Sequence, residues 1–372
     1  MSEGKHIHII SLDVPFPADY GGALDIYYRI VALHRLGFKI HLHCFEYGRG
    51  EQSHLNQFVE EVHYYSRKKS IRHVLSRLPF IVNSRQSNKL FQRLLQDNHP
   101  ILFEGIHTTL LLNNPRLKER IKLVRMHNVE QDYYAALAKK SKGWKKQFYQ
   151  NESRKLKRYE TVLSNAQHIL AIQSNDKKHF ETFHKSVHLL PVCVSDINVE
   201  SFHSTKSYCL FHGNLSVEEN RVAASWLLEH VIAKNHLEIP FVFAGKNPSA
   251  QLKKICTEKG VQLFENPSET QMQQLVQEAR VHVLYTDQAT GVKLKLINAL
   301  NSSGYVLANP LMVQGTNVTD LCTVYDSPKA CLSAIDEGMK NPLSDTFVHA
   351  RLNRLSELFN TLENCKLIDQ LT

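Results

Sequence analysis

The sequence lacks the features that define several protein classes. No apolar run approaches the ~18 residues of a membrane-spanning helix, and the opening stretch MSEGKHIHIISLDVP has no apolar segment followed by a small-residue cleavage site. No CxxC, HExxH, DxD or GxGxxG pattern occurs anywhere in the chain. We therefore expect no membrane span, no secretory signal, no dinucleotide fingerprint and no catalytic metal.

The cysteines do not form a recognisable framework. Their number, seven, is odd, and their spacing is wide. A disulfide scaffold or a thiolate zinc site needs closely spaced or paired cysteines. We therefore expect reduced, mostly buried thiols and a cytoplasmic protein.

The composition is ordinary, but the charge is unevenly spread. The chain has 372 residues, 42% hydrophobic and 22% charged, which is typical of a globular protein of two domains. The net charge is +9. Residues 62–96 contain eight Lys or Arg and no acid, and residues 139–158 contain nine Lys or Arg and one acid, Glu152. Such a field attracts anionic lipid, nucleic acid or an acidic saccharide.

The first half alternates between strand-like and helix-like segments. A helix is predicted over Ala23–Leu36, ending at Gly37, and a long polar helix over Gln131–Ser164. The predicted strands are His6–Leu12, Lys39–Phe45, Ile101–Glu104, Ile121–Arg125 and His168–Ile172.

The second half repeats the same alternation after a polar break at 190–206. Its predicted strands are Tyr208–His212, Phe241–Ala244, Val261–Phe264, Val281–Tyr285 and Tyr305–Ala308. Strands separated by helices of 10–15 residues predict parallel sheets covered on both faces. We expect an α/β fold with two doubly wound, Rossmann-like domains facing a cleft, at 1–195 and 196–345, and a C-terminal helix, 346–372, that packs back toward the first domain.

Ligands of doubly wound sheets bind outside the carboxyl ends of the strands, so the loops there carry the candidate sites. In the first half, the pair Gly21–Gly22 opens a helix, where free N–H groups favour an anion or simply form a tight turn. His107 follows a strand and either polarises a bound group or packs in the loop. After the next strand come four polar residues that could line a site or cap a helix, Arg125, His127, Asn128 and Glu130.

In the second half, two loops stand out. Gly213 and Asn214 follow a strand, and Ser216 with Glu219 fits a capping box, which we interpret as structural. Gly291 opens a helix over Val292–Asn301 that carries Lys293 and Lys295 in its first turn. Cations are unfavourable at a helix N-terminus unless an anion is bound there, so this loop predicts a phosphate site; a solvated lysine pair is the alternative.

Two further patterns remain. His6 and His8, and likewise His41 and His43, each face one side of a strand; we interpret them as buried or rim histidines rather than metal ligands. Residues 139–158 interleave Trp144 with lysines, as in a helix lying on an anionic membrane or a solvated helix with one packed stripe. Nucleic acid is not an expected partner, because no nucleic-acid-binding motif accompanies the charge.

Several longer motifs together resemble a known family. The chain is similar to GT-B fold glycosyltransferases of the retaining family GT4, of the kind found in bacterial surface-polysaccharide clusters. The resemblance covers nearly the whole chain and lies in PFPADYGGA, FEGIHTT, RMHNVEQDYY, HGNLSVEENRVAASWLLEHV, FAGKNP and TGVKLKLINALNSSGYVLAN.

The resemblance implies a nucleotide-sugar donor held by the second domain and an acceptor held by the first, with no metal and no cofactor. It implies catalytic roles for His107 and for Lys293, the cation nearest the diphosphate. It implies acceptor contacts by Arg125, His127, Asn128 and Glu130. Implied donor contacts are Gly21, Gly22, Gly213, Asn214, Gly245, Asn266, Thr290, Gly291, Lys295 and Asn298.

One departure from the family pattern stands in the last motif. The family has two glutamates there, seven residues apart; Asn298 stands in place of the second, and the first is missing, since Thr290-Gly291 leads the motif. An amide can hydrogen-bond a ribose diol, but without the added strength of a charge.

The expected function is transfer of a hexose, such as mannose or glucose, from a nucleotide-sugar to a lipid-linked or polysaccharide acceptor, with retention, by a cytoplasmic enzyme peripheral to the membrane. Two alternatives stay open. One is a non-catalytic GT-B protein that binds within a polysaccharide assembly complex. The other is a UDP-sugar 2-epimerase.

Overall fold

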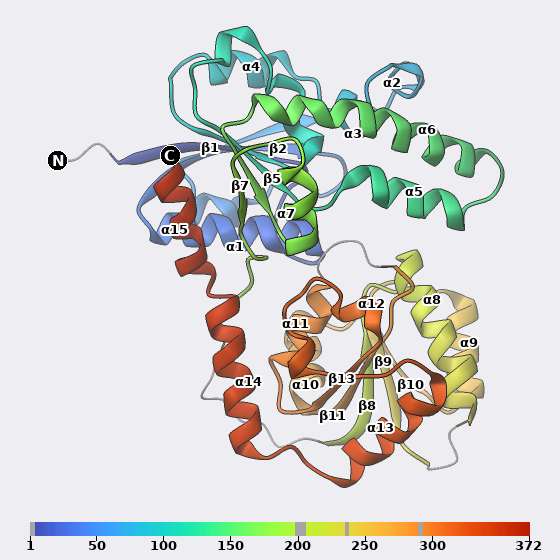
Figure 1. The fold of residues 1–372 in the computed structure, drawn as a ribbon. Coiled ribbons are helices and arrows are strands. Elements are labelled where there is room, and N and C mark those ends of the chain that lie inside the picture. The colour runs from blue at the N-terminus through green and yellow to red at the C-terminus, as the bar shows by residue number, and fades with distance from the viewer. Residues whose placement is uncertain (1–3, 198–205, 235–237, 289–292) are drawn as a thin grey trace. The chain divides into compact units, whose positions relative to one another are not determined.

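The computed structural model describes residues 4–197, 206–234, 238–288 and 293–372. The chain divides into two compact units. Unit 1 comprises Met1–Ser195 with Phe359–Thr372, and unit 2 comprises Asp196–Leu358. Each unit is built on one parallel sheet with helices (Figure 1). Within the described residues, no helix combines the length and the apolarity needed to cross a membrane.

The sheet of unit 1 has seven strands, all parallel where they pair. In spatial order they are β3 (Glu61–Ser66), β2 (Phe38–Glu46), β1 (Lys5–Ser11), β4 (Ile101–Glu104), β5 (Lys122–Met126), β6 (His168–Ala171) and β7 (Val187–Leu189). The helices of the unit are α1 (Gly21–Arg35), α2 (Ile71–Leu75), α3 (Phe80–Asn83), α4 (Asn88–Leu94), α5 (Glu130–Lys140), α6 (Gly143–Tyr159), α7 (Ser174–Glu181) and α15 (Thr361–Leu371).

Unit 2 has a six-stranded sheet. Its order is β10 (Gln262–Glu265), β9 (Phe241–Gly245), β8 (Lys206–His212), β11 (Ala279–Leu284), β12 (Tyr305–Ala308) and β13 (Thr323–Val324). The helices are α8 (Glu218–Trp226), α9 (Ala250–Glu258), α10 (Glu269–Glu278), α11 (Leu294–Leu300), α12 (Pro310–Val313), α13 (Pro328–Lys340) and α14 (Asp345–Leu358). In both sheets the first strand of the unit, β1 or β8, stands third in the spatial order, and the strand order reverses beside it, which creates a switch point.

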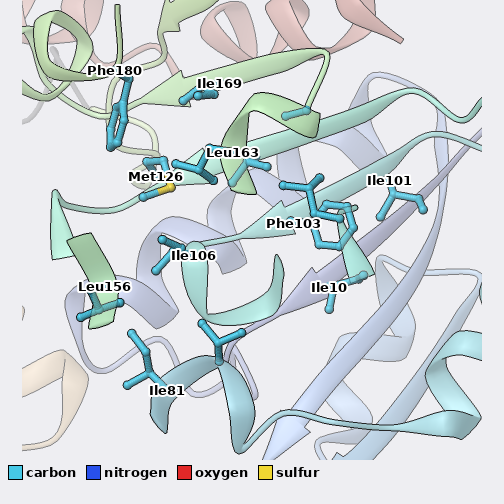
Figure 2. Close-up of a cluster of buried hydrophobic side chains, with 14 of the residues drawn as sticks. Ile10, Ile81, Ile101, Phe103, Ile106, Met126, Leu156, Leu163, Ile169 and Phe180 are labelled. Carbon is cyan, nitrogen blue, oxygen red and sulfur yellow. The ribbon is translucent and has the colours of Figure 1, made fainter. Parts of the chain in front are cut away.

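Alternation along the strands produces two apolar layers in unit 1. Ile10 of β1 points into one cluster, with Phe103, Met126 and Phe180 (Figure 2), whereas its neighbour Ile9 points into the other. Successive side chains of a strand face opposite sides, so a sheet covered on both faces needs apolar residues at both positions.

Helix α15 completes the second of these layers. Cys365 and Ile368 are fully buried in it, beside α1 (Figure 1). The Thr361 hydroxyl donates to the Val194 carbonyl at 2.8 Å and accepts from the Val194 N–H at 2.9 Å. The last helix of the chain is therefore part of the N-terminal unit.

Two helix predictions were wrong in detail. The expected helix over Gln131–Ser164 is two helices, α5 and α6, that pack against each other, because Ser141 is extended and Gly143 adopts φ +59°. The expected single helix over 346–372 is likewise two, because Asn360 is extended and caps α15 by accepting from the Glu363 N–H.

The burial of α15 gives a stability prediction. Ile368→Ala should lower the free energy of unfolding of unit 1 by about 2–5 kcal/mol, since it leaves a cavity in a packed layer. Hydrogen exchange should speed up in β1 and β2, although these strands are more than 300 residues away in the chain. Urea unfolding and exchange mass spectrometry measure both effects. Ile71→Ala is the matched control, because Ile71 is 75% exposed; equal loss in the two variants would contradict the assignment.

Candidate functional site

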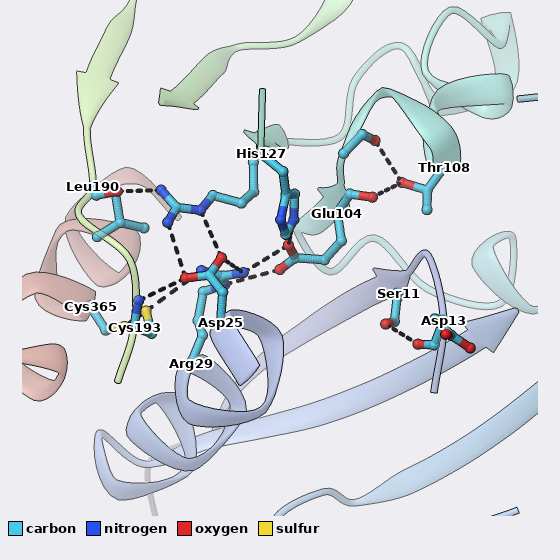
Figure 3. A network of polar contacts seen from close by, with 12 residues as sticks. Ser11, Asp13, Asp25, Arg29, Glu104, Thr108, His127, Leu190, Cys193 and Cys365 are labelled. Atoms are coloured by element: carbon cyan, nitrogen blue, oxygen red, sulfur yellow. Dashed lines mark hydrogen bonds and ion pairs between the residues drawn. The ribbon is translucent and has the colours of Figure 1, made fainter. Parts of the chain in front are cut away.

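A buried network of charges lies under the carboxyl edge of the unit 1 sheet (Figure 3). Arg29 of α1 donates to Glu104 at the end of β4, over 2.8 and 2.9 Å, and to Asp25 over 3.0 Å. Arg125 of β5 donates to Asp25 at 3.2 and 3.3 Å and to the carbonyls of Leu190 and Pro191. Burial alone would raise the pKa of Asp25, but Arg125 and Arg29 outweigh it and hold that pKa far below its usual range.

The network carries one side chain toward the surface. His127 contacts Glu104, with 3.0 Å between Nε2 and Oε2, and is partly exposed. Asp25, Glu104 and His127 could together hold a cation, but the two guanidiniums already neutralise both carboxylates. Arg125 is fully buried and its donors are used internally, so it supports the edge from beneath; this burial argues against the expected direct contact with an acceptor.

His107 lies at the same edge. Its Nδ1 is buried and has no hydrogen-bond partner among the described residues. Burial, and then the nearby Arg85, holds the pKa of His107 well below its usual value, so the ring is neutral. Gly105 has φ +71°, and a Cβ there would lie 2.8 Å from His107 Nδ1. The glycine therefore lets the ring fold back beside His127.

Two buried acids complete this edge. Glu130 begins α5 and is contacted by the Asn128 amide at 3.4 Å; burial raises its pKa to about 7. Asp176 of α7 has its pKa raised to about 6 by burial, and its Oδ2 has no partner among the described residues. Sequence reasoning missed Asp176, although its place directly after the strand ending near Ile172 was a usable signal. Gly21 and Gly22 begin α1, which has no side-chain N-cap.

The carboxyl edge of the unit 2 sheet is formed by loops that touch through their backbones. The Gly213 N–H donates to the Ala244 carbonyl, and the Asn266 N–H donates to the Gly245 carbonyl. A Cβ on Gly245 would lie 1.8 Å from the Gly213 carbonyl oxygen, so only glycine fits there. The Asn214 carbonyl accepts from the Asn220 side chain at 2.9 Å. Gly213, Asn214, Gly245 and Asn266 thus lie close together at this edge.

Lys293 and Lys295 converge on the start of α8. Lys293 pairs with Glu219 at 3.0 Å, and Lys295 donates to the Asn220 side-chain oxygen at 2.8 Å. Burial lowers the pKa of Lys295 to about 8. Lys293, Lys295 and hydrogen bonds from Thr286 and Gln288 outweigh burial and lower the pKa of Glu219 to about 2.

These contacts correct two sequence interpretations. Glu219 is not part of a capping box, since Val217 caps α8 without a side-chain bond and the Ser216 hydroxyl donates to Asn214. The unfavourable cation at the helix start is balanced inside the chain by Glu219, so it does not by itself require a phosphate. Asn298 is exposed on α11. Thr290 and Gly291 lie outside the described residues.

Comparison with known proteins identifies the architecture. No family model matches the chain. A Klebsiella pneumoniae protein described as an uncharacterized 44.6 kDa protein in the cps region is 28% identical over 331 residues, which covers 83% of this chain and 84% of that protein. Among solved structures, HepE from Anabaena in complex with UDP and glucose matches with a TM-score of 0.66 at 11% identity over 99% of both chains. TarM matches with a TM-score of 0.65 at 10% identity, over 100% of this chain and 99% of TarM.

The chain has the GT-B fold. The predicted α/β class with two Rossmann-like sheets is confirmed. At identities this low the likeness establishes the fold alone, because one fold can support many different reactions.

The raised pKa of Glu130 gives a pH prediction. The folded state holds the proton more tightly than the unfolded state, so stability declines as the pH rises from about 4.5 to about 7. Glu130→Gln removes this cost and should stabilise the protein at pH 8 by on the order of 3 kcal/mol, with a much smaller gain near pH 5. Urea midpoints at both pH values measure it. Asp132→Asn, at an exposed site in the same turn, should show no such difference; a pH-independent gain in Glu130→Gln would count against the assignment.

Proposed function

We propose that this protein is a glycosyltransferase that moves a hexose from a nucleotide-sugar to a lipid-linked or polysaccharide acceptor, without a metal and with retention. The observation that carries the proposal is the pair Lys293 and Lys295 beside the glycine-lined loops of unit 2. Solved structures of HepE, which has a similar fold, hold UDP, UDP with glucose, or UDP-glucose.

The donor roles follow from charge and access. The diphosphate of a nucleotide-sugar needs cations and backbone N–H groups around it, and Gly213 and Gly245 let a ligand approach the backbone closely. We assign the first contact to Lys295, because its partner is the neutral amide of Asn220, whereas Lys293 is already balanced by Glu219. Asn266 would border the base, and Asn298 the ribose.

The acceptor roles fall to the carboxyl edge of unit 1. A neutral His107 with a buried Nδ1 can hydrogen-bond a sugar hydroxyl, and His127, held by Glu104, can do the same. Glu130 and Asn128 lie next to them. The leaving diphosphate would carry most of the developing charge, so stabilising it is the main task of the site.

The alternatives predict different products. The Glu219–Lys293 pair favours the non-catalytic binding protein, because an internal anion already occupies the place of a phosphate on Lys293. Such a protein would bind a nucleotide-sugar without transferring or hydrolysing it. A 2-epimerase would convert a UDP-sugar to its epimer with no acceptor present, which product analysis of the same incubation detects.

The assignment of Lys295 gives a binding prediction. A thermal-shift and calorimetric panel of UDP, GDP, ADP and their sugars should find one base that binds. Lys295→Met should weaken that binding by roughly tenfold or more, a loss of about 1.4 kcal/mol. Wild-type affinity should fall as the pH rises from 7 to 9, because only the protonated amine neutralises phosphate and the pKa of Lys295 is about 8.

Lys295→Arg is the matched control, since it keeps the charge at every pH. It should retain binding and flatten the pH dependence. Full binding by Lys295→Met, or a pH profile shared by wild type and Lys295→Arg, would remove Lys295 from the donor site. Transfer of labelled hexose by the wild type, and its absence in Lys295→Met, tests the enzymatic proposal itself.

We also propose that unit 1 contacts an anionic membrane surface, as a lipid-linked acceptor requires. Three large apolar side chains are exposed there among lysines and arginines: Ile71 (75%) and Leu75 (80%) on α2 and Trp144 (75%) on α6. Apolar insertion and attraction to anionic lipid add together in interfacial binding.

Vesicle sedimentation tests this contact. The wild type should pellet with phosphatidylglycerol vesicles, less so at high salt, and not with phosphatidylcholine vesicles. The double variant Leu75→Ser/Trp144→Ala should lose most of this binding. Val217→Ser removes an exposed apolar side chain from unit 2 and should bind as the wild type does. Equal binding by all three proteins would exclude the surface.

A further inference from the structure

Six histidines gather on one face of the unit 1 sheet, toward the amino-terminal ends of its strands. This is the edge opposite the candidate acceptor site. The parallel register places His8 of β1 beside His41 of β2, and His43 of β2 beside His63 of β3. Side chains two residues apart share a face, which adds His6. His99, in the turn before β4, stacks on the His6 ring with 4.5 Å between centroids.

Three of these rings bring ring nitrogens close together. The His6 Nδ1 and His41 Nε2 atoms are 2.9 Å apart, and one nitrogen from each of His6, His41 and His99 lies within 4.8 Å of the others. Nitrogen ligands about 2.0–2.1 Å from a tetrahedral zinc are separated by roughly 3.3 Å. A metal therefore needs only a slight opening of the His6–His41 pair and a rotation of the His99 ring.

The remaining contacts of His41 prepare it as a ligand. Its Nδ1 is 2.6 Å from a Glu61 carboxylate oxygen, so Nδ1 carries the proton and donates it. This leaves the lone pair on Nε2, which faces His6. A carboxylate that holds the outer N–H of a histidine is the usual support of a metal-bound imidazole, since it fixes the tautomer and raises the basicity. Glu61 also contacts His63 Nε2 at 2.9 Å, which fixes the carboxylate in turn.

The ring nitrogens of His99 are also available to a metal ion. Among the described residues, neither ring nitrogen of His99 has a hydrogen-bond partner. All three rings remain partly exposed, so an ion can reach them.

Two further histidines of the cluster, His8 and His43, are buried. His8 Nε2 contacts Asp97 at 3.0 Å, and His43 Nδ1 contacts the Tyr65 hydroxyl at 2.9 Å, with His8 and His43 bonded to each other at 2.9 Å. Both nitrogens of each ring are used, so these two histidines do not supply ligands.

We propose that His6, His41 and His99 form a binding site for a divalent transition metal, zinc in the first place, with Glu61 orienting His41 and water completing the coordination. The metal replaces the hydrogen bond between His6 and His41. Both rings stay neutral: the His6 proton moves from Nδ1 to Nε2, and no net proton is released. Bound there, the ion ties β1, β2 and the turn before β4 together at the edge of unit 1 away from the proposed acceptor residues.

The experiment uses the full chain without an affinity tag, stripped with a chelator and titrated with ZnCl₂ at pH 7.5. We expect one zinc per chain, a raised melting temperature and, with CoCl₂ in its place, the visible absorption of a low-symmetry cobalt site. His6→Gln and His99→Gln should each weaken zinc binding by about tenfold or more, and Glu61→Gln by about 10–100-fold.

Two controls keep the outcome decisive. His230→Gln, an exposed histidine of unit 2, should bind zinc as the wild type does. Circular dichroism and the melting temperature without metal confirm that each variant folds. Wild-type affinity in both His6→Gln and His99→Gln, or no zinc bound at 100 µM, would overturn the site.

Discussion

The buried arrangement of two arginines and two carboxylates in unit 1 is the constraint on which the candidate acceptor edge depends. Arg29, Arg125, Asp25 and Glu104 come from a helix and two strands, and their charges cancel. Removing one partner of such a set is strongly destabilising, because it leaves a charge buried without compensation. The four charges can therefore pair only when α1 is packed in its native position against β4 and β5. Two carbonyls at 190–191 and the Cys193 N–H bind to the same groups, which fixes the chain as it leaves the sheet.

The strands that could be predicted from the sequence are those with continuous apolar runs. The central strands of both sheets were placed within two residues of their ends, because buried parallel strands leave a strong signal. The strands β3, β7 and β13 were missed. They lie at sheet edges, and β3 reads EVHYYS, where polar side chains fit an exposed edge. The break between α5 and α6 depends on the extended backbone of Ser141 and the positive φ of Gly143, which a sequence pattern does not reveal.

Candidate residues that follow strands could be singled out from the sequence, whereas those on helices could not. Gly213 was singled out from its loop after a strand, whereas Gly245 and Asn266 came from the family resemblance; parallel strands bring these loops to one edge. Asp25 was not assigned a role and Glu219 was assigned only a helix-capping one, although each balances arginines or a lysine at its edge. Both sit within or at the start of helical patterns, where a carboxylate is ordinarily solvated or a cap. Only the packing of distant segments distinguishes such a residue from a surface one.

The pairing of Thr361 with Val194 and the burial of Ile368 bear on how this chain is made. During translation the ribosome releases residues in order, and domains generally fold as complete units. All of unit 2, Asp196–Leu358, emerges before the final helix does. The part of unit 1 that is synthesised first is thus completed last, because its second apolar layer stays open until Thr361–Leu371 has left the ribosome.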